Sequence, residues 1–191
     1  MKKLFLTLLT IAFCTAAYSQ TVETIRKDYN AAKAYVQEME GPDSPAQNRV
    51  RISTEEMYCG TGQHKETVTI YFRQDEENEE PCNKNLICFV TNSYNWAVRE
   101  YYEEYLYDQD GNIEFIYAKD VDDNDFSETE YRIYYSTKGV IKLIVKSKGV
   151  DDTKFAEVYN GSTVAPKYKE KCDNYKRLSE HFKALYDQFI N

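Results

Sequence analysis

Histidine, tryptophan and glycine are scarce in this chain: 191 residues include only two histidines, one tryptophan and seven glycines. His64 and His181 stand in no recognisable nucleophile motif, and the sequence Gly-x-Ser-x-Gly is absent. Few histidines and the lack of a Cys-x-x-Cys pair argue against a zinc site. The sequence therefore predicts no metal and no cofactor, and it favours a non-catalytic protein.

Basic residues are also in deficit. The chain has 24 Lys and Arg against 32 Asp and Glu, which gives a net charge of -8 at pH 7. Proteins that bind nucleic acids use clustered positive charge to meet the phosphates. This composition argues against a nucleic-acid partner and disfavours anionic membrane surfaces.

Long apolar runs are missing except at the start of the chain. Lys2 and Lys3 precede an apolar stretch from Leu4 to about Ala17, which is typical of a secretory signal peptide. A transmembrane helix needs about 20 apolar residues, so we expect no membrane span.

We predict cleavage after Ser19, so that residues 1–19 are a signal peptide and residues 20–191 form a single exported domain. Lipidation at Cys14 is less favoured, because the bulky Phe13 precedes it and the apolar stretch continues behind it. The Ala-x-Ser-Gln sequence at 17–20 resembles the leader ends of exported proteins from Gram-negative, Bacteroidetes-type bacteria. That resemblance implies a periplasmic, cell-surface or secreted location.

The period of the apolar residues predicts an α+β fold. Apolar residues recur at helical steps over 21–40 and again from Pro166 to Phe189, whereas the region between them alternates with a period of two. We expect an antiparallel β-sheet of about six or seven strands packed against an N-terminal and a long C-terminal α-helix. The predicted strands cover 49–52, 67–73, 86–90, 98–107, 113–117, 131–135 and 141–145.

Three polar segments are predicted to be loops. Asp108-x-Asp110-x-Asn112 is typical of a hairpin turn, because it lacks the glycine and the glutamate of an EF-hand loop. The acidic segment 120–128 departs from the EF-hand pattern too, although calcium binding of another kind stays open there. Asn160-Gly161-Ser162 is predicted to be a loop rather than a glycosylation site.

Four cysteines follow the leader, and exported thiols tend to pair. Four cysteines allow three connectivities. Cys59 and Cys82 flank a predicted strand and lie roughly 20 Å apart along it, too far for a direct bond. We favour disulfides between Cys59 and Cys172 and between Cys82 and Cys88.

Tyrosine is the unusual component, with 18 copies. Adjacent tyrosines on a strand point to opposite faces, so some rings should face away from the core. We predict a contact surface for a glycan or protein partner at Tyr101, Tyr105, Tyr107 and Tyr117. The sequence thus favours an exported binding domain. The alternatives are a carrier of an apolar ligand or an enzyme-inhibitor-like domain with a protruding loop at 75–85, and then a hydrolase that uses two carboxylates.

Overall fold

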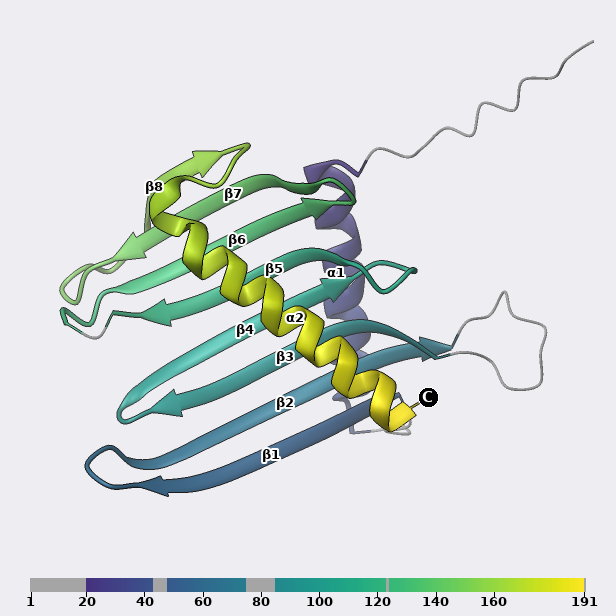
Figure 1. Cartoon of the computed structure of the whole chain (residues 1–191), viewed down its shortest axis with the longest axis horizontal. Helices are drawn as coiled ribbons and strands as arrows, with labels where there is room; N and C mark the ends of the chain where they lie inside the picture. Colours follow the sequence, from purple (N-terminus) through teal and green to yellow (C-terminus); the bar gives the residue numbers. More distant parts are fainter. Residues whose placement is uncertain (1–19, 43–47, 75–84, 123, 191) are drawn as a thin grey trace, which may run out of the picture.

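A computed structural model of the chain describes residues 20–42, 48–74, 85–122 and 124–190. Eight antiparallel strands lie in one sheet in the same order as in the chain, and a helix crosses each face (Figure 1). The strands are β1 Arg49–Tyr58, β2 Gly62–Gln74, β3 Asn85–Trp96, β4 Arg99–Tyr107, β5 Ile113–Val121, β6 Glu128–Ser136, β7 Gly139–Lys148 and β8 Ala156–Gly161. The α+β architecture with an antiparallel sheet is confirmed.

The sheet has eight strands rather than the expected six or seven, and the strand that was not predicted is the edge strand β8. Its side chains are largely exposed, so it lacks the apolar alternation that marks the other strands. The prediction of a loop at Asn160 and Gly161 was wrong, because both residues belong to β8.

The N-terminal helix α1 covers Val22–Met39, as predicted. Thr21 caps it, because its hydroxyl accepts a hydrogen bond from the Thr24 backbone N–H at 3.2 Å, while the Thr24 hydroxyl accepts one from the Thr21 N–H at 2.9 Å. Ile25, Ala32 and Val36 form part of the buried stripe that packs on the sheet.

The C-terminal helix α2 covers Lys169–Ile190 and follows a short 3-10 turn that begins at Pro166. It crosses the opposite face of the sheet diagonally (Figure 1). Its own residues Tyr175, Phe182 and Tyr186 are buried against the sheet. Neither helix in the described part of the chain is long and apolar enough to cross a membrane.

Two hydrophobic cores result, one on each side of the sheet. Tyr105 and Tyr107 of β4 belong to the core under α2, whereas Leu106 between them belongs to the core under α1. The central strands are therefore apolar on both faces, and alternation along a strand decides which helix a side chain meets.

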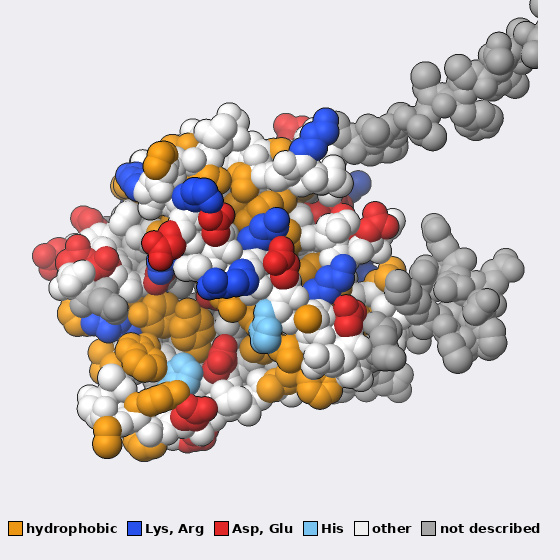
Figure 2. All heavy atoms as spheres, viewed as in Figure 1, with side chains coloured by type: hydrophobic (Ala, Val, Ile, Leu, Met, Phe, Trp, Pro, Cys, Tyr) orange, Lys and Arg blue, Asp and Glu red, His pale blue; other side chains and the backbone are white. Residues whose placement is uncertain are grey.

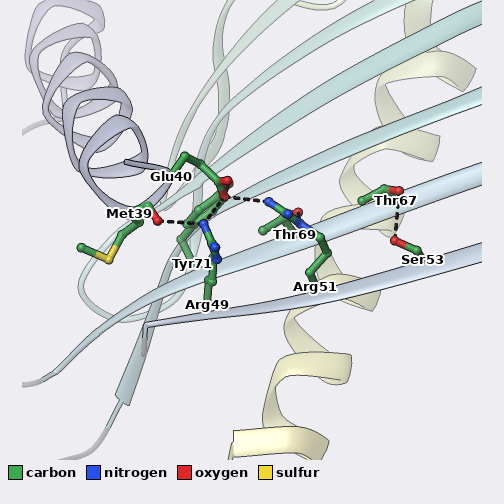
Figure 3. A network of polar contacts seen from close by, with 8 residues as sticks. All are labelled: Met39, Glu40, Arg49, Arg51, Ser53, Thr67, Thr69 and Tyr71. Carbon is green, nitrogen blue, oxygen red and sulfur yellow. Dashed lines mark hydrogen bonds and ion pairs between the residues drawn. The ribbon is translucent and has the colours of Figure 1, made fainter. Parts of the chain in front are cut away.

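A polar network ties the end of α1 to the edge strand β1 (Figure 3). The Glu40 carboxylate pairs with Arg49 at 2.7 Å and with Arg51 at 2.8 Å, and it accepts a hydrogen bond from the Tyr71 hydroxyl at 2.8 Å. Arg49 also donates to the Met39 carbonyl at 2.7 Å. These contacts hold the first half of β1 against the C-terminal end of α1.

Candidate binding site

The four tyrosines predicted as one contact surface lie on both faces of the sheet. Tyr105 and Tyr107 are 0% and 5% exposed beneath α2, so the prediction that they point outward was wrong. Their hydroxyls donate to Glu103 at 2.6 Å and to the Ser179 carbonyl at 2.7 Å. The sequence pattern predicted which side chains alternate between the two faces, but it could not predict that α2 would cross over Tyr105 and Tyr107.

Tyr117 points to the α1 side, where it is half-buried and donates a hydrogen bond to Glu130 at 3.0 Å. Tyr101 lies on the α2 side, near the hairpin end of β4 that follows Trp96. Of the four predicted residues, only Tyr101 lies in the candidate site described below.

That site is a group of five rings on the α2 side, which we call the aromatic surface. It consists of Tyr58, His64, Tyr94, Trp96 and Tyr101, from β1, β2, β3 and β4. Figure 2 shows hydrophobic side chains gathered beside α2 over this corner of the sheet. The helix runs diagonally, so it leaves the hairpin ends of these strands open (Figure 1).

The rings touch one another in a continuous series. Tyr94 and Tyr101 stack with centroids 4.8 Å apart and an interplanar angle of 4°. Trp96 lies 5.9 Å from His64 and 5.4 Å from Tyr58. Trp96 and Tyr58 are 41% and 40% exposed, so the outer part of the series faces solvent.

Strand register produces this arrangement. Tyr94 is directly opposite Tyr101 across β3 and β4, and residues opposed in an antiparallel pair point to the same face. Residues two apart on a strand also share a face, which places Trp96 beside Tyr94. Four neighbouring strands thus bring together rings that are widely separated in sequence.

The Asn95 side chain braces the strand ends that carry the rings. Its amide nitrogen donates to the Gln63 carbonyl at 2.8 Å and to the Ala97 carbonyl at 3.0 Å, and its oxygen accepts from the Lys65 N–H at 2.7 Å. The His64 ring forms a hydrogen bond with the Asn95 carbonyl. The surface is therefore held in place before any ligand arrives.

Backbone strain also lies beside the aromatic surface. Within the described residues, Ala97 and Phe126 are the two non-glycine residues with positive φ, at 55° and 57°. Ala97 directly follows Trp96, and the Phe126 ring lies 4.7 Å from the guanidinium of Arg99, the cross-strand partner of Trp96. Strain of this kind concentrates at functional sites.

A buried carboxylate lies next to the rings. Glu103 is 2% exposed and accepts hydrogen bonds from Tyr105 at 2.6 Å and from Asn92 and Tyr94 at 3.3 Å each. Burial raises the pKa of Glu103 above its ordinary value. Burial and the nearby Glu103 also raise the pKa of Tyr94, so this phenol stays protonated and can donate hydrogen bonds.

Two acids near the rings, Glu103 and Asp120, are already engaged. Glu103 accepts three hydrogen bonds, and Asp120 forms an ion pair with Lys171 of α2. Hydrolysis by paired carboxylates needs one acid to donate a proton and another to activate water or attack. The contacts of Glu103 and Asp120 favour a structural role for both.

The cysteines correct the predicted disulfides. Cys59, Cys88 and Cys172 form no disulfide with one another in the structure. Cys59 is exposed at the tip of the β1–β2 hairpin, whereas Cys172 lies close to Tyr135 of β6, about 24 Å away at five strand spacings. The predicted Cys59–Cys172 bond is therefore excluded by this structure. Cys82 lies outside the described residues, so its predicted bond to Cys88 stays a prediction.

The acidic turns form hydrogen bonds within themselves. The Asp108 carboxylate accepts from the backbone N–H groups of Asp110 at 2.9 Å and Asn112 at 2.7 Å, as expected for a hairpin turn. In the second segment, Asp122 accepts from the Asn124 N–H at 2.8 Å. Within the described ranges, no group of three or more His, Cys, Asp or Glu is arranged to hold a metal ion.

A pocket of about 700 Å³ lies at the other end of the sheet, on the α1 side. Its lining includes Gln20, Asp28, Arg73, Asp108 and Glu114. Glu114 is 7% exposed and accepts a hydrogen bond from the Gln20 amide at 2.5 Å. Burial raises its pKa to about 7, and Asp28 and Asp108 add to this effect. A lining with this many charges is poorly suited to the apolar ligand of a carrier.

No protein-family model, curated protein or solved structure matches this chain in the three comparisons made. The functional assignment is therefore based on the fold, the aromatic surface and the pocket beside Glu114.

Proposed function

We propose that this chain is a non-catalytic, exported binding domain that holds a glycan on the aromatic surface. The observation that carries the proposal is the series of contacting rings at the open hairpin ends, with Trp96 and Tyr58 about two-fifths exposed. The export expected from residues 1–19 is part of the proposal.

Sugar rings offer one flat face of C–H groups and a rim of hydroxyls. Exposed aromatic rings supply a rigid apolar face for stacking at little cost in side-chain entropy. The hydroxyl oxygens of Tyr58 and Tyr94, whose protons go to Glu56 and Glu103, can still accept hydrogen bonds, and Nε2 of His64 adds a further polar group because only Nδ1 bonds the Asn95 carbonyl. This combination suits a ligand that is apolar on its face and polar at its rim.

The surrounding charge narrows the ligand class. Glu56 accepts a hydrogen bond from the Tyr58 hydroxyl, and Glu66 lies opposite Tyr94 across β2 and β3. Glu103 is buried beside the same rings. These three carboxylates outnumber the guanidinium of Arg99, the cross-strand partner of Trp96, and favour a neutral or amino-substituted sugar over a phosphorylated or sulfated one.

The only tryptophan of the chain lies in the proposed site, so its fluorescence reports on binding directly. The purified protein should be titrated with neutral and amino-substituted oligosaccharides, with selective excitation of Trp96. We expect a saturable change, and Tyr58→Ala should weaken binding roughly tenfold because one stacking ring is lost.

Phe189→Ala is the matched control, because Phe189 is 62% exposed but lies near the end of α2, away from the aromatic surface. It should bind like the unmodified protein. Trp96→Ala is tested by affinity electrophoresis in polysaccharide gels and should migrate without retardation. Absence of a saturable response across the sugars, or full retardation of Trp96→Ala, would reject the glycan assignment.

A protein partner is the second candidate, and the exposure of Val98 favours it. Val98 is 87% exposed at the β3–β4 turn, and an aliphatic tip of this kind contributes to protein contacts rather than to sugar stacking. Val98→Ser separates the two functions, because it should leave glycan binding unchanged and weaken a protein complex.

A further inference from the structure

The strand β1 forms one edge of the sheet, and within the described ranges no strand lies beyond it (Figure 1). Its ten residues from Arg49 to Tyr58 pair with β2 without a register shift. The other edge, β8, has six residues and an irregularity in its pairing with β7. Proteins protect exposed edges with short strands, prolines, bulges or charged side chains, and of these devices β1 has only the charges of Arg49, Arg51, Glu55 and Glu56.

The hydrogen bonds to β2 show which groups of β1 point outward. The Phe72 N–H donates to the Asn48 carbonyl at 3.0 Å, so Asn48 faces β2. Facing alternates along an antiparallel strand. The backbone groups that point away from the sheet therefore belong to Arg49, Arg51, Ser53, Glu55 and Met57.

Charge is divided between the two halves of β1. In the first half, Arg49 and Arg51 share the single carboxylate of Glu40 (Figure 3). In the second half lie Glu55 and Glu56, and the nearest basic partner of Glu55, Lys65, is 3.7 Å away with both side chains more than half exposed. The first half thus has an excess of positive charge and the second an excess of negative charge.

We propose that β1 pairs with β1 of a second copy of this chain, antiparallel and with Ser53 on the two-fold axis. If the two-fold axis is perpendicular to the sheet, the two sheets continue as one, and the α2 sides of both copies lie on the same face of it. Residues opposed across the new strand pair then point to the same face. Arg51 of each copy lies opposite Glu55 of the other. A parallel arrangement would place like charges together instead.

In this register, every outward-pointing backbone N–H and C=O group of β1 has a partner in the second copy. About ten backbone hydrogen bonds form, two for each opposed pair of outward residues. Met57 is 75% exposed and comes to lie opposite Arg49, whose aliphatic stem covers apolar surface. The pairing therefore explains an exposed methionine on an otherwise polar strand end.

Sedimentation over a range of concentrations tests the proposal on the purified chain. We expect a reversible dimer, and Ser53→Pro should raise its dissociation constant roughly tenfold or more, because proline removes the outward N–H at the axis. The same change spares the hydrogen bonds to β2. Ser53→Ala is the matched control, since it loses the 3.2 Å side-chain contact with Thr67 but keeps the N–H, and it should stay dimeric.

A charge variant covers the case in which Ser53→Pro fails to fold. Glu55→Arg places an arginine opposite Arg51 and should weaken the dimer, whereas Glu56→Arg changes the α2 side and should weaken it less. Hydrogen exchange should show concentration-dependent protection of the outward amides of β1 and none at β8. A monomer at all concentrations, a dimer that Ser53→Pro and Glu55→Arg leave intact, or protection at β8 would overturn the proposal.

Discussion

Replacing Glu114 with glutamine should change how stability depends on pH. Glu114 is buried, and its pKa rises from 4.5 to about 7 in the folded protein. The folded state therefore binds the proton more tightly than the unfolded chain does. The stabilisation is fully present below about pH 4.5 and is lost as the pH rises through about 7.

The size of the effect follows from the pKa change. One pKa unit corresponds to about 1.4 kcal/mol, so the shift from 4.5 to about 7 is worth at most about 3.5 kcal/mol of unfolding free energy. Glutamine mimics the neutral carboxyl group and still accepts the hydrogen bond from Gln20. Glu114→Gln should match the unmodified protein at about pH 4 and exceed its stability by about 2 to 3 kcal/mol at about pH 8.

Urea unfolding at both pH values, followed by Trp96 fluorescence, gives the two free energies by linear extrapolation. Glu100→Gln is the control, because Glu100 is exposed on β4, and it should leave the pH dependence unchanged. A stability difference between the Glu114→Gln variant and the unmodified protein that is the same at both pH values would refute the reasoning.

Two further predictions concern the backbone and the thiols. Ala97→Gly should raise the free energy of unfolding by about 0.5 kcal/mol, because glycine adopts the positive φ of 55° without strain, whereas Val98→Gly should lower it. Calorimetry of both variants measures these changes. A lower free energy of unfolding in Ala97→Gly would contradict the presence of strain at this position. In the native protein Cys59 should react quickly with a thiol reagent and Cys172 only on unfolding, because burial raises the pKa of Cys172 to about 11. A Cys59–Cys172 peptide in a mass spectrum of unreduced digest would contradict this.

Local periodicity was sufficient to predict both helices and most of the sheet. The stripe that includes Ile25 and Val36 faces the sheet as its spacing indicates, and the alternation around Ile133 and Leu143 marks buried strands. β8 escaped prediction because its side chains are mostly exposed and carry no such pattern. The polar ends of β1 and β2 were missed for the same reason.

The candidate site needed information that a single strand does not carry. Alternation places Tyr101 and Tyr105 on one face, but the diagonal path of α2 leaves Tyr101 half-buried and covers Tyr105 completely. The contacts of His64, Trp96 and Tyr58 depend on register across several strands. A useful signal was present in the sequence, since Trp96 immediately precedes the turn at Ala97 and Val98, where a ring on a hairpin end is poorly covered.

The order of the strands has a consequence for how the chain folds. Each strand pairs with the one that follows it, so the sheet can grow by successive hairpins with short loop closures, a topology that shortens folding times for a β-rich protein. The helix α2 comes last in the chain, and until it docks, the rings of Tyr105 and Tyr107 stay open to solvent. The interval before α2 docks is therefore when a newly made chain is most prone to aggregate, and a chain shortened before α2 should remain in that vulnerable state.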